Sequence, residues 1–149
     1  MFTSTPHFAK NVFFSCIDDR LSNAHAEFIK NIGGAFAIAI AGGGLALLSP
    51  DDRKVALKEI ALAYMINKID HVYLESHMEC GAYKFAGVHF NDPEQELECL
   101  YSDLDKAAAA VRTELLRAGA KSDEVEVTVR VVDTDGHVVQ RAKTLQPQA

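Results

Sequence analysis

Two kinds of apolar segment alternate along this chain, and their alternation is the feature that most constrains its fold. Short apolar runs typical of buried strands are separated by segments in which apolar residues recur every three or four positions, as on one face of a helix. The expected strands cover residues 11–17, 35–41, 71–77 and 125–131. Because strands that alternate with helices form parallel sheets covered on both faces, the pattern predicts a three-layer α/β domain with a mainly parallel central sheet.

A helix is expected over residues 50–67, which begin with proline and two aspartates. Ser49 can cap the free N–H groups, proline suits the first turn, and the acids complement the positive end of the helix dipole. The apolar spacing of Val55, Leu62 and Ile66 predicts that these side chains face inward. A shorter helix is expected before it, with Leu21, Ala24 and Phe28 on one face.

A second long helix is expected to begin at Asp92, with Gln95 completing a capping box. Its apolar stripe ends before Gly119. The stripe consists of Leu97, Leu100, Tyr101, Leu104, Ala108, Val111 and Leu115. The last strand, "VEVTVRV" at 125–131, alternates valine with polar residues and therefore lies near a sheet edge. Asp135-Gly136 predicts a hairpin turn into a final antiparallel edge strand, "HVV".

Composition narrows the classes of partner. The chain of 149 residues is expected to form one domain, 1–149, and its net charge of −6 without a Lys/Arg cluster argues against nucleic acid. Its longest apolar run, residues 35–48, is interrupted by three glycines and is too short to span a membrane. The first residues do not resemble a signal peptide, and three cysteines do not suggest a disulfide framework. We therefore expect a cytoplasmic protein.

Metal-ligating side chains follow two of the expected strands. Cys16 ends the first strand, His77 ends the third, and Cys80 comes three residues later. In a parallel sheet the carboxyl ends of neighbouring strands open into one crevice, which is where functional sites are usually found. Zinc favours sulfur and nitrogen ligands, and three protein ligands leave its fourth position open, as in catalytic sites. These residues are therefore the candidate ligands of one Zn²⁺ per chain.

Asp18 and Arg20 follow Cys16 closely enough to take part in the same site. Zinc lowers the pKa of a bound water to near neutrality, and the hydroxide that forms is a nucleophile. The Asp18 carboxylate can accept a hydrogen bond from this hydroxide and orient it. Arg20 can hold Asp18 in a bidentate pair and keep it ionised.

Two motifs resemble those of the beta-class carbonic anhydrases. "CIDDR" at residues 16–20 resembles the family's Cys-x-Asp-Ser/Ala-Arg motif, and "HMECG" at 77–81 resembles His-x-x-Cys-Gly, at the family's separation of about sixty residues. The resemblance implies a zinc enzyme, a lyase that reversibly hydrates carbon dioxide to bicarbonate by a zinc-bound hydroxide. It assigns zinc to Cys16, His77 and Cys80, and the catalytic dyad to Asp18 and Arg20.

The resemblance also implies a sheet ordered 2-1-3-4 with an antiparallel edge strand, and a homodimer or a larger even homo-oligomer. In some family members the dyad aspartate itself becomes the fourth zinc ligand, which is an option for Asp18. The chain departs from the family after the second strand, where Ala35 lies near an Asp position and Ile40-Ala41 near an Arg-Asn pair. Asp19 occupies the usual Ser or Ala position.

These departures make the expected pocket wall more apolar than in the family. A related hydrolase of carbonyl sulfide or carbon disulfide is therefore an alternative. A non-catalytic zinc-binding homologue and a metal-free thiol enzyme using Cys16 are further alternatives. Cys99 falls among polar residues and is interpreted as incidental, and His25 is the reserve candidate for moving protons. The three glycines at 42–44 lack the residues of a phosphate-binding loop.

Overall fold

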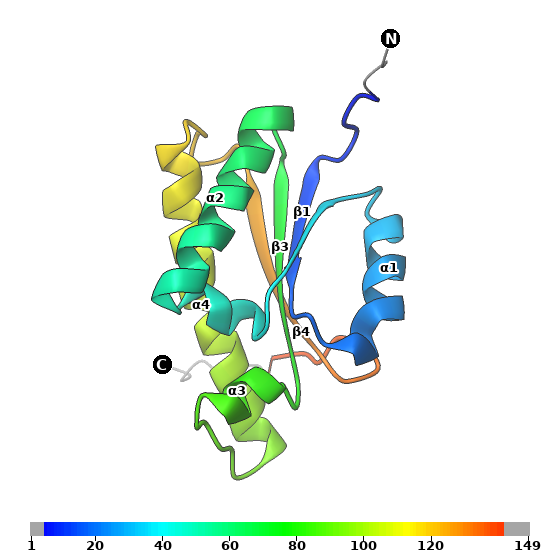
Figure 1. Ribbon diagram of the computed structural model, residues 1–149, viewed down its shortest axis with the longest axis vertical. Coiled ribbons are helices and arrows are strands. Elements are labelled where there is room, and N and C mark those ends of the chain that lie inside the picture. Colours follow the sequence, from blue (N-terminus) through cyan, green and yellow to red (C-terminus); the bar gives the residue numbers. More distant parts are fainter. Residues whose placement is uncertain (1–4, 142–149) are drawn as a thin grey trace, which may run out of the picture.

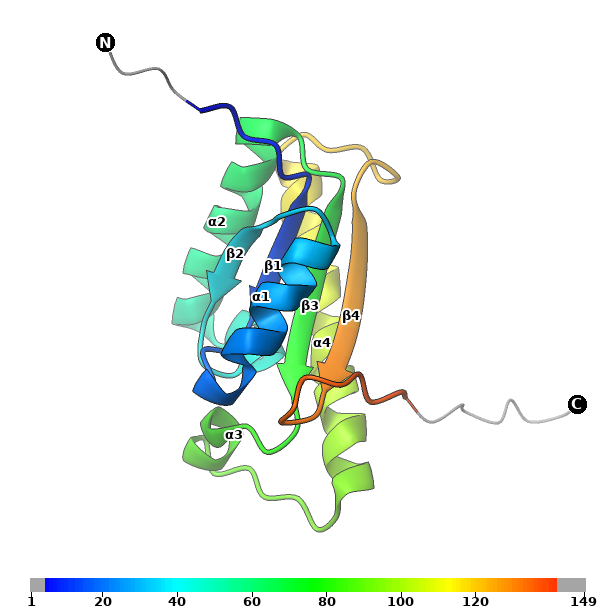
Figure 2. The same cartoon turned by 90° about the vertical axis from the view of Figure 1, so that its right-hand side faces the viewer.

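The computed structural model describes residues 5–141 and consists of three layers (Figures 1 and 2). A four-stranded parallel sheet forms the middle layer, with the order β2-β1-β3-β4, as expected. Its strands are β1 Asn11–Ser15, β2 Phe36–Ala39, β3 His71–His77 and β4 Glu126–Val132. The first two are shorter than expected, because the chain leaves the sheet before Cys16 and Ile40.

Helices cover the sheet on both faces. Figure 2 shows α1 on one face, and α2 and α4 on the other. The helices are α1 Ser22–Asn31, α2 Pro50–Asn67, α3 Gly81–Phe85 and α4 Pro93–Arg117, with two 3-10 turns, η1 Asp19–Leu21 and η2 Gly43–Leu47. No helix in the described part of the chain is both long enough and apolar enough to cross a membrane.

The apolar stripe expected on the last helix is confirmed for α4, which buries Leu100, Leu104 and Val111 against the sheet. The expected N-cap at its start is confirmed, but the capping box is altered, because Gln95 bonds the residue before the cap. The Asp92 side chain accepts a hydrogen bond from the Gln95 N–H at 2.8 Å. The Gln95 side chain accepts one from the N–H of the preceding residue, Asn91, at 2.7 Å. These bonds satisfy N–H groups that lack helical partners.

The expected inward face of α2 is wrong. Val55, Leu62 and Ile66 are 56%, 39% and 49% exposed, whereas Ile60 and Tyr64 are buried. The helix has two apolar faces with the same spacing, and it buries the one that also carries its alanines. Small side chains let the helix approach the sheet closely, so packing selects a face that the spacing alone leaves open. Ser49 precedes the helix as expected, but its side chain makes no capping hydrogen bond.

The expected antiparallel edge strand does not form within the described residues. The turn after β4 is present, with Gly136 at φ 87°, but only one antiparallel bridge follows, between Val132 and Val138. The Tyr101 hydroxyl donates to the Val139 carbonyl at 2.7 Å, and Arg141 binds Asp105 on α4 at 2.7 Å. The Val139 N–H still donates to the Val131 carbonyl at 2.8 Å, so this segment lies between β4 and α4, and no second bridge to β4 follows in the described residues.

The glycine loop after β2 packs tightly against β3. Gly43 has φ 54°, and a Cβ atom built on it would collide with the Glu75 carbonyl oxygen. The Gly44 N–H donates to the Ser76 hydroxyl at 3.0 Å. A side chain in this loop would therefore push it away from the end of β3, where His77 lies.

We expect Gly43→Ala to lower the free energy of unfolding by about 2 kcal/mol or more, because it adds both a strained φ and a backbone collision. Urea unfolding of the metal-free protein measures this change. Gly33→Ala is the matched control, since Gly33 has φ 85° but nothing within 4 Å of an added Cβ. The control should cost only about 1 kcal/mol. Equal losses in the two variants would contradict the predicted collision.

Candidate metal centre

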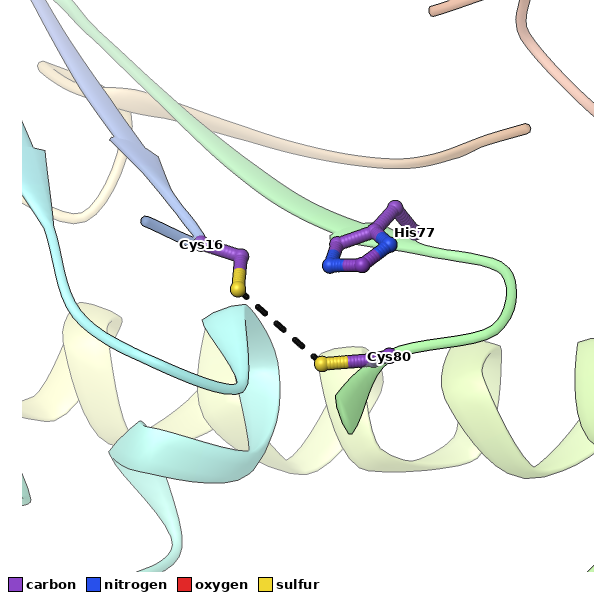
Figure 3. A group of neighbouring side chains, drawn as sticks. All are labelled: Cys16, His77 and Cys80. Carbon is purple, nitrogen blue, oxygen red and sulfur yellow. Dashed lines mark hydrogen bonds between the residues drawn. The ribbon is translucent and has the colours of Figure 1, made fainter. Parts of the chain in front are cut away.

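The structure brings Cys16, His77 and Cys80 together at the carboxyl end of the sheet (Figure 3). Cys16 follows β1, His77 is the last residue of β3, and Cys80 is the cap residue before α3. Since β1 and β3 pair in parallel, both strands deliver their last side chains to the same edge. All three side chains are buried, and their ligand atoms lie within 4.8 Å of one another.

The geometry and donor set of this group fit zinc. The Cys16 and Cys80 Sγ atoms are 3.9 Å apart, close to the spacing of about 3.8 Å that two thiolates have on tetrahedral zinc. His77 Nδ1 donates to the Met78 carbonyl at 2.8 Å, which leaves a lone pair on Nε2. Nε2 of His77 is the one buried side-chain nitrogen or oxygen in residues 5–141 that has no hydrogen-bond partner. A buried polar atom of this kind needs a partner, and a metal ion provides one.

Hydrogen bonds favour the thiolate form of Cys16. The Cys80 Sγ shares a hydrogen bond with the Cys16 Sγ at 3.9 Å, and the Gly42 N–H donates to the same Cys16 sulfur at 3.3 Å. These two contacts hold the pKa of Cys16 well below its ordinary value, although burial opposes the shift. No local pattern indicates this role of Gly42, because its N–H reaches Cys16 only through the pairing of β2 with β1. The positive φ of Gly42, 99°, is a conformation that glycine adopts readily.

Asp18 and Arg20 form the expected pair. Arg20 Nε donates to Asp18 Oδ1 at 3.0 Å, and Nη2 donates to Oδ2 at 2.8 Å. The Arg20 side chain lowers the pKa of Asp18 to about 2. Because the pKa is lowered, the stabilisation from this pair is present above the ordinary value of 3.8 and is lost as the pH falls toward 2.

This pair lies beside the free nitrogen of the histidine. Asp18 Oδ2 is 3.6 Å from His77 Nε2, so the carboxylate faces the position where the three candidate ligands converge. Arg20 also donates to the Glu79 carbonyl at 3.2 Å, which connects the dyad to the segment between His77 and Cys80. In this structure the Asp18 carboxylate is therefore hydrogen-bonded to Arg20, and its Oδ2 atom faces the cluster.

Two other candidates lie outside the cluster. His25, on α1, binds the buried Glu75 carboxylate through Nε2 at 2.6 Å, and Glu75 also accepts from Arg130 at 2.8 Å. This imidazole is engaged in a hydrogen bond with Glu75 and lies outside the Cys16–His77–Cys80 cluster. Cys99, on α4, is half-buried, and its Sγ lies 4.0 Å from Asp103 Oδ2. It does not belong to the candidate metal site.

A cavity of about 560 Å³ opens beside Gly81, the residue after Cys80, but none of the three candidate ligands lines it. Ser49 and Asp52 are its polar lining residues. Its wall is mainly apolar and includes Ala41, Leu45, Gly81, Ala82 and Phe85. Ala41 belongs to the pair of residues at which the sequence departs from the beta-class pattern. The structure therefore places this residue in the wall of a mainly apolar cavity that follows the candidate ligands in the chain but is not lined by them.

Comparisons with known proteins connect this architecture to one group of enzymes. No family model matches the chain, and no curated protein matches its sequence. Solved structures do match. A β-carbonic anhydrase of Aspergillus fumigatus superposes with a TM-score of 0.53 at 19% identity, over 93% of this chain and 77% of that chain.

Two further structures agree with this match. The apo form of a carbon disulfide hydrolase gives a TM-score of 0.52 at 18% identity, over 94% of this chain and 82% of that one. A carbonic anhydrase of Glaciozyma antarctica gives 0.51 at 16% identity, over 93% and 85%. At such identities the similarity concerns the fold. This chain has the α/β fold that the beta-class carbonic anhydrases and carbon disulfide hydrolase share.

Proposed function

We propose that this chain is a zinc-dependent carbonic anhydrase that reversibly hydrates carbon dioxide to bicarbonate, with residues 1–149 as one domain. One observation carries the proposal. The Asp18–Arg20 pair lies 3.6 Å from the unpartnered Nε2 of His77, beside two thiols whose spacing suits zinc. A metal site of structural purpose would need a fourth protein ligand, and it would not need an oriented carboxylate at its open side.

In the proposed site Cys16, His77 and Cys80 would hold the metal. When bound there, zinc supplies the Lewis acidity that makes water nucleophilic near neutral pH. Asp18 accepts a hydrogen bond from the attacking group and orients it. Arg20 holds the pKa of Asp18 below its ordinary value, so the carboxylate stays ionised at neutral pH and is available as a hydrogen-bond acceptor. Arg20 fixes the carboxylate through two hydrogen bonds.

The apolar cavity supports a small uncharged substrate. Ala41, Leu45 and Ala82 contribute an uncharged wall, and Asp52 is the one charged residue that lines this cavity. Carbon dioxide is linear and neutral and fits such a cavity. The same property favours a second candidate, hydrolysis of carbonyl sulfide or carbon disulfide, because these molecules are equally linear and more apolar. The fold shared with a carbon disulfide hydrolase is consistent with this candidate.

We expect the purified protein to contain one zinc ion per chain. Cys16→Ser and His77→Ala should each lose most of this zinc, because each removes one of three ligands, as measured by inductively coupled plasma mass spectrometry. Cys99→Ser is the matched control and should retain zinc, since Cys99 lies outside the cluster. Zinc-free native protein, or zinc loss in the control alone, would contradict the proposed site.

We expect Asp18→Asn to retain zinc and to lower the rate of carbon dioxide hydration by roughly 100-fold, because the nucleophile is no longer oriented. Stopped-flow measurements between about pH 6.5 and 9 bracket the pKa near 7 of water on zinc. Asp19→Asn is the matched control, since Asp19 is the exposed neighbour and should leave the rate unchanged. Zinc-loaded native protein that hydrates no carbon dioxide but hydrolyses the sulfur compounds would favour the second candidate. Turnover of none of them would indicate a non-catalytic zinc protein.

We further propose a cytoplasmic homodimer or a larger even oligomer. Exposed apolar side chains support association, notably Val55, Met65 and Ile66 on α2 and Phe85 on α3, which is 95% exposed. Multi-angle light scattering is expected to give the mass of two chains or of a higher even number. The mass of a single chain at micromolar concentration would contradict this assembly.

A further inference from the structure

We propose that Glu96, on α4, is a positioning residue for the metal centre, because its carboxylate holds the turn that connects two of the three candidate ligands. The inference rests on the proposed zinc site and adds a residue that none of the sequence motifs contains. Met78 and Glu79 form this turn between His77 and Cys80. Its conformation decides how the imidazole and the thiol are placed relative to each other.

The turn has a backbone conformation that must be held from outside. Glu79 has φ 57°, in the left-handed region that residues with a Cβ atom rarely adopt. Such a conformation persists where the surrounding structure determines it. The contacts made by the turn therefore show what fixes the two ligands.

All four backbone polar groups of Met78 and Glu79 have partners. The Met78 N–H donates to the Val132 carbonyl at the end of β4 at 2.9 Å. The Met78 carbonyl accepts from His77 Nδ1, and the Glu79 carbonyl accepts from Arg20 Nη2 at 3.2 Å. The remaining group, the Glu79 N–H, donates to Glu96 Oε1 at 2.5 Å. The turn is thus attached to a strand, to the dyad and to α4.

The bond to Glu96 attaches the Glu79 N–H to a helix, whereas the bond from β4 attaches the neighbouring residue, Met78. Glu96 lies in the first turn of α4, and the same helix is anchored in the core by Leu100 and Leu104, which are fully buried. A hydrogen bond to a charged acceptor is about twice as strong as one between neutral groups. Because α4 is fixed by its packing, the hydrogen bond to Glu96 holds Glu79 in its unfavourable backbone conformation.

The consequence concerns the metal more than the stability of the fold. Without the Glu96 acceptor, Glu79 is free to leave the left-handed region, and Cys80 then moves relative to His77. Groups that orient metal ligands from outside change metal affinity by about 10- to 100-fold when they are removed. Glu96 thus contributes to metal affinity without contacting the metal.

The test compares variants of the full chain by zinc affinity, measured by competition with a chromophoric chelator, and by the visible absorption of the Co²⁺-substituted protein. Glu96→Ala is expected to weaken zinc binding by about tenfold or more and to change the Co²⁺ spectrum, which reports ligand geometry. Glu94→Ala is the matched control, since it removes an exposed carboxylate from the same helical turn. The control should leave both readouts unchanged.

Two conservative variants distinguish the effect of side-chain length at position 96 from the effect of its charge. They also provide a test if Glu96→Ala does not fold. Glu96→Gln keeps the length and an acceptor oxygen but loses the charge, whereas Glu96→Asp keeps the charge and loses the length. We expect zinc affinity in Glu96→Gln to be closer to native than in Glu96→Asp. The reverse order, or equal affinity in Glu96→Ala and Glu94→Ala, overturns the inference while leaving the zinc site intact. Absence of stoichiometric zinc in the native chain would instead overturn the proposed function, and the inference with it.

Discussion

The parallel pairing of β1 with β3 is the constraint on which the rest of the site depends. Phe14 lies opposite Leu74 in this pairing, so the two strands end at the same edge and bring Cys16 to His77 from 61 positions away in the chain. The pairing also places the glycine loop after β2 against the end of β3, because β2 is the other neighbour of β1. The Gly42 N–H can then donate to the Cys16 sulfur.

Burial of the polar groups at this edge is possible because almost all of them have partners. Ser76, Glu75 and the backbone of the turn after β3 are hydrogen-bonded to neighbouring elements. Buried polar groups without partners are costly, so the isolated Nε2 of His77 stands out against this background. The same atom faces two thiols and the Asp18 carboxylate, and a metal ion would satisfy all of them at once. Because the neighbouring buried polar groups are hydrogen-bonded, the unpartnered Nε2 of His77 indicates a ligand site.

Several parts of the fold were predictable because their causes are local. Asp92 caps α4 as expected, since capping depends on residues three or four positions apart. The span of β3 agrees with its apolar run, whereas the strand order agrees with what the resemblance to the beta-class carbonic anhydrases implies. The inward face of α2 was wrong, because Val55 and Ile60 lie on two apolar faces of equal spacing. The antiparallel edge strand failed for a similar reason, since contacts with α4 compete with the pairing to β4.

By itself, the sequence determined the types of the candidate ligands, their positions at strand ends and the pairing of Asp18 with Arg20, which lie two residues apart. These features depend on residue chemistry and on short separations along the chain. Only the tertiary structure decided that Gly42 donates to Cys16 and that Glu96 holds Glu79, because both contacts join segments that the sheet and α4 bring together. Such contacts depend on packing between distant elements, and no local pattern in the chain encodes the distance between two backbone or side-chain atoms across the fold.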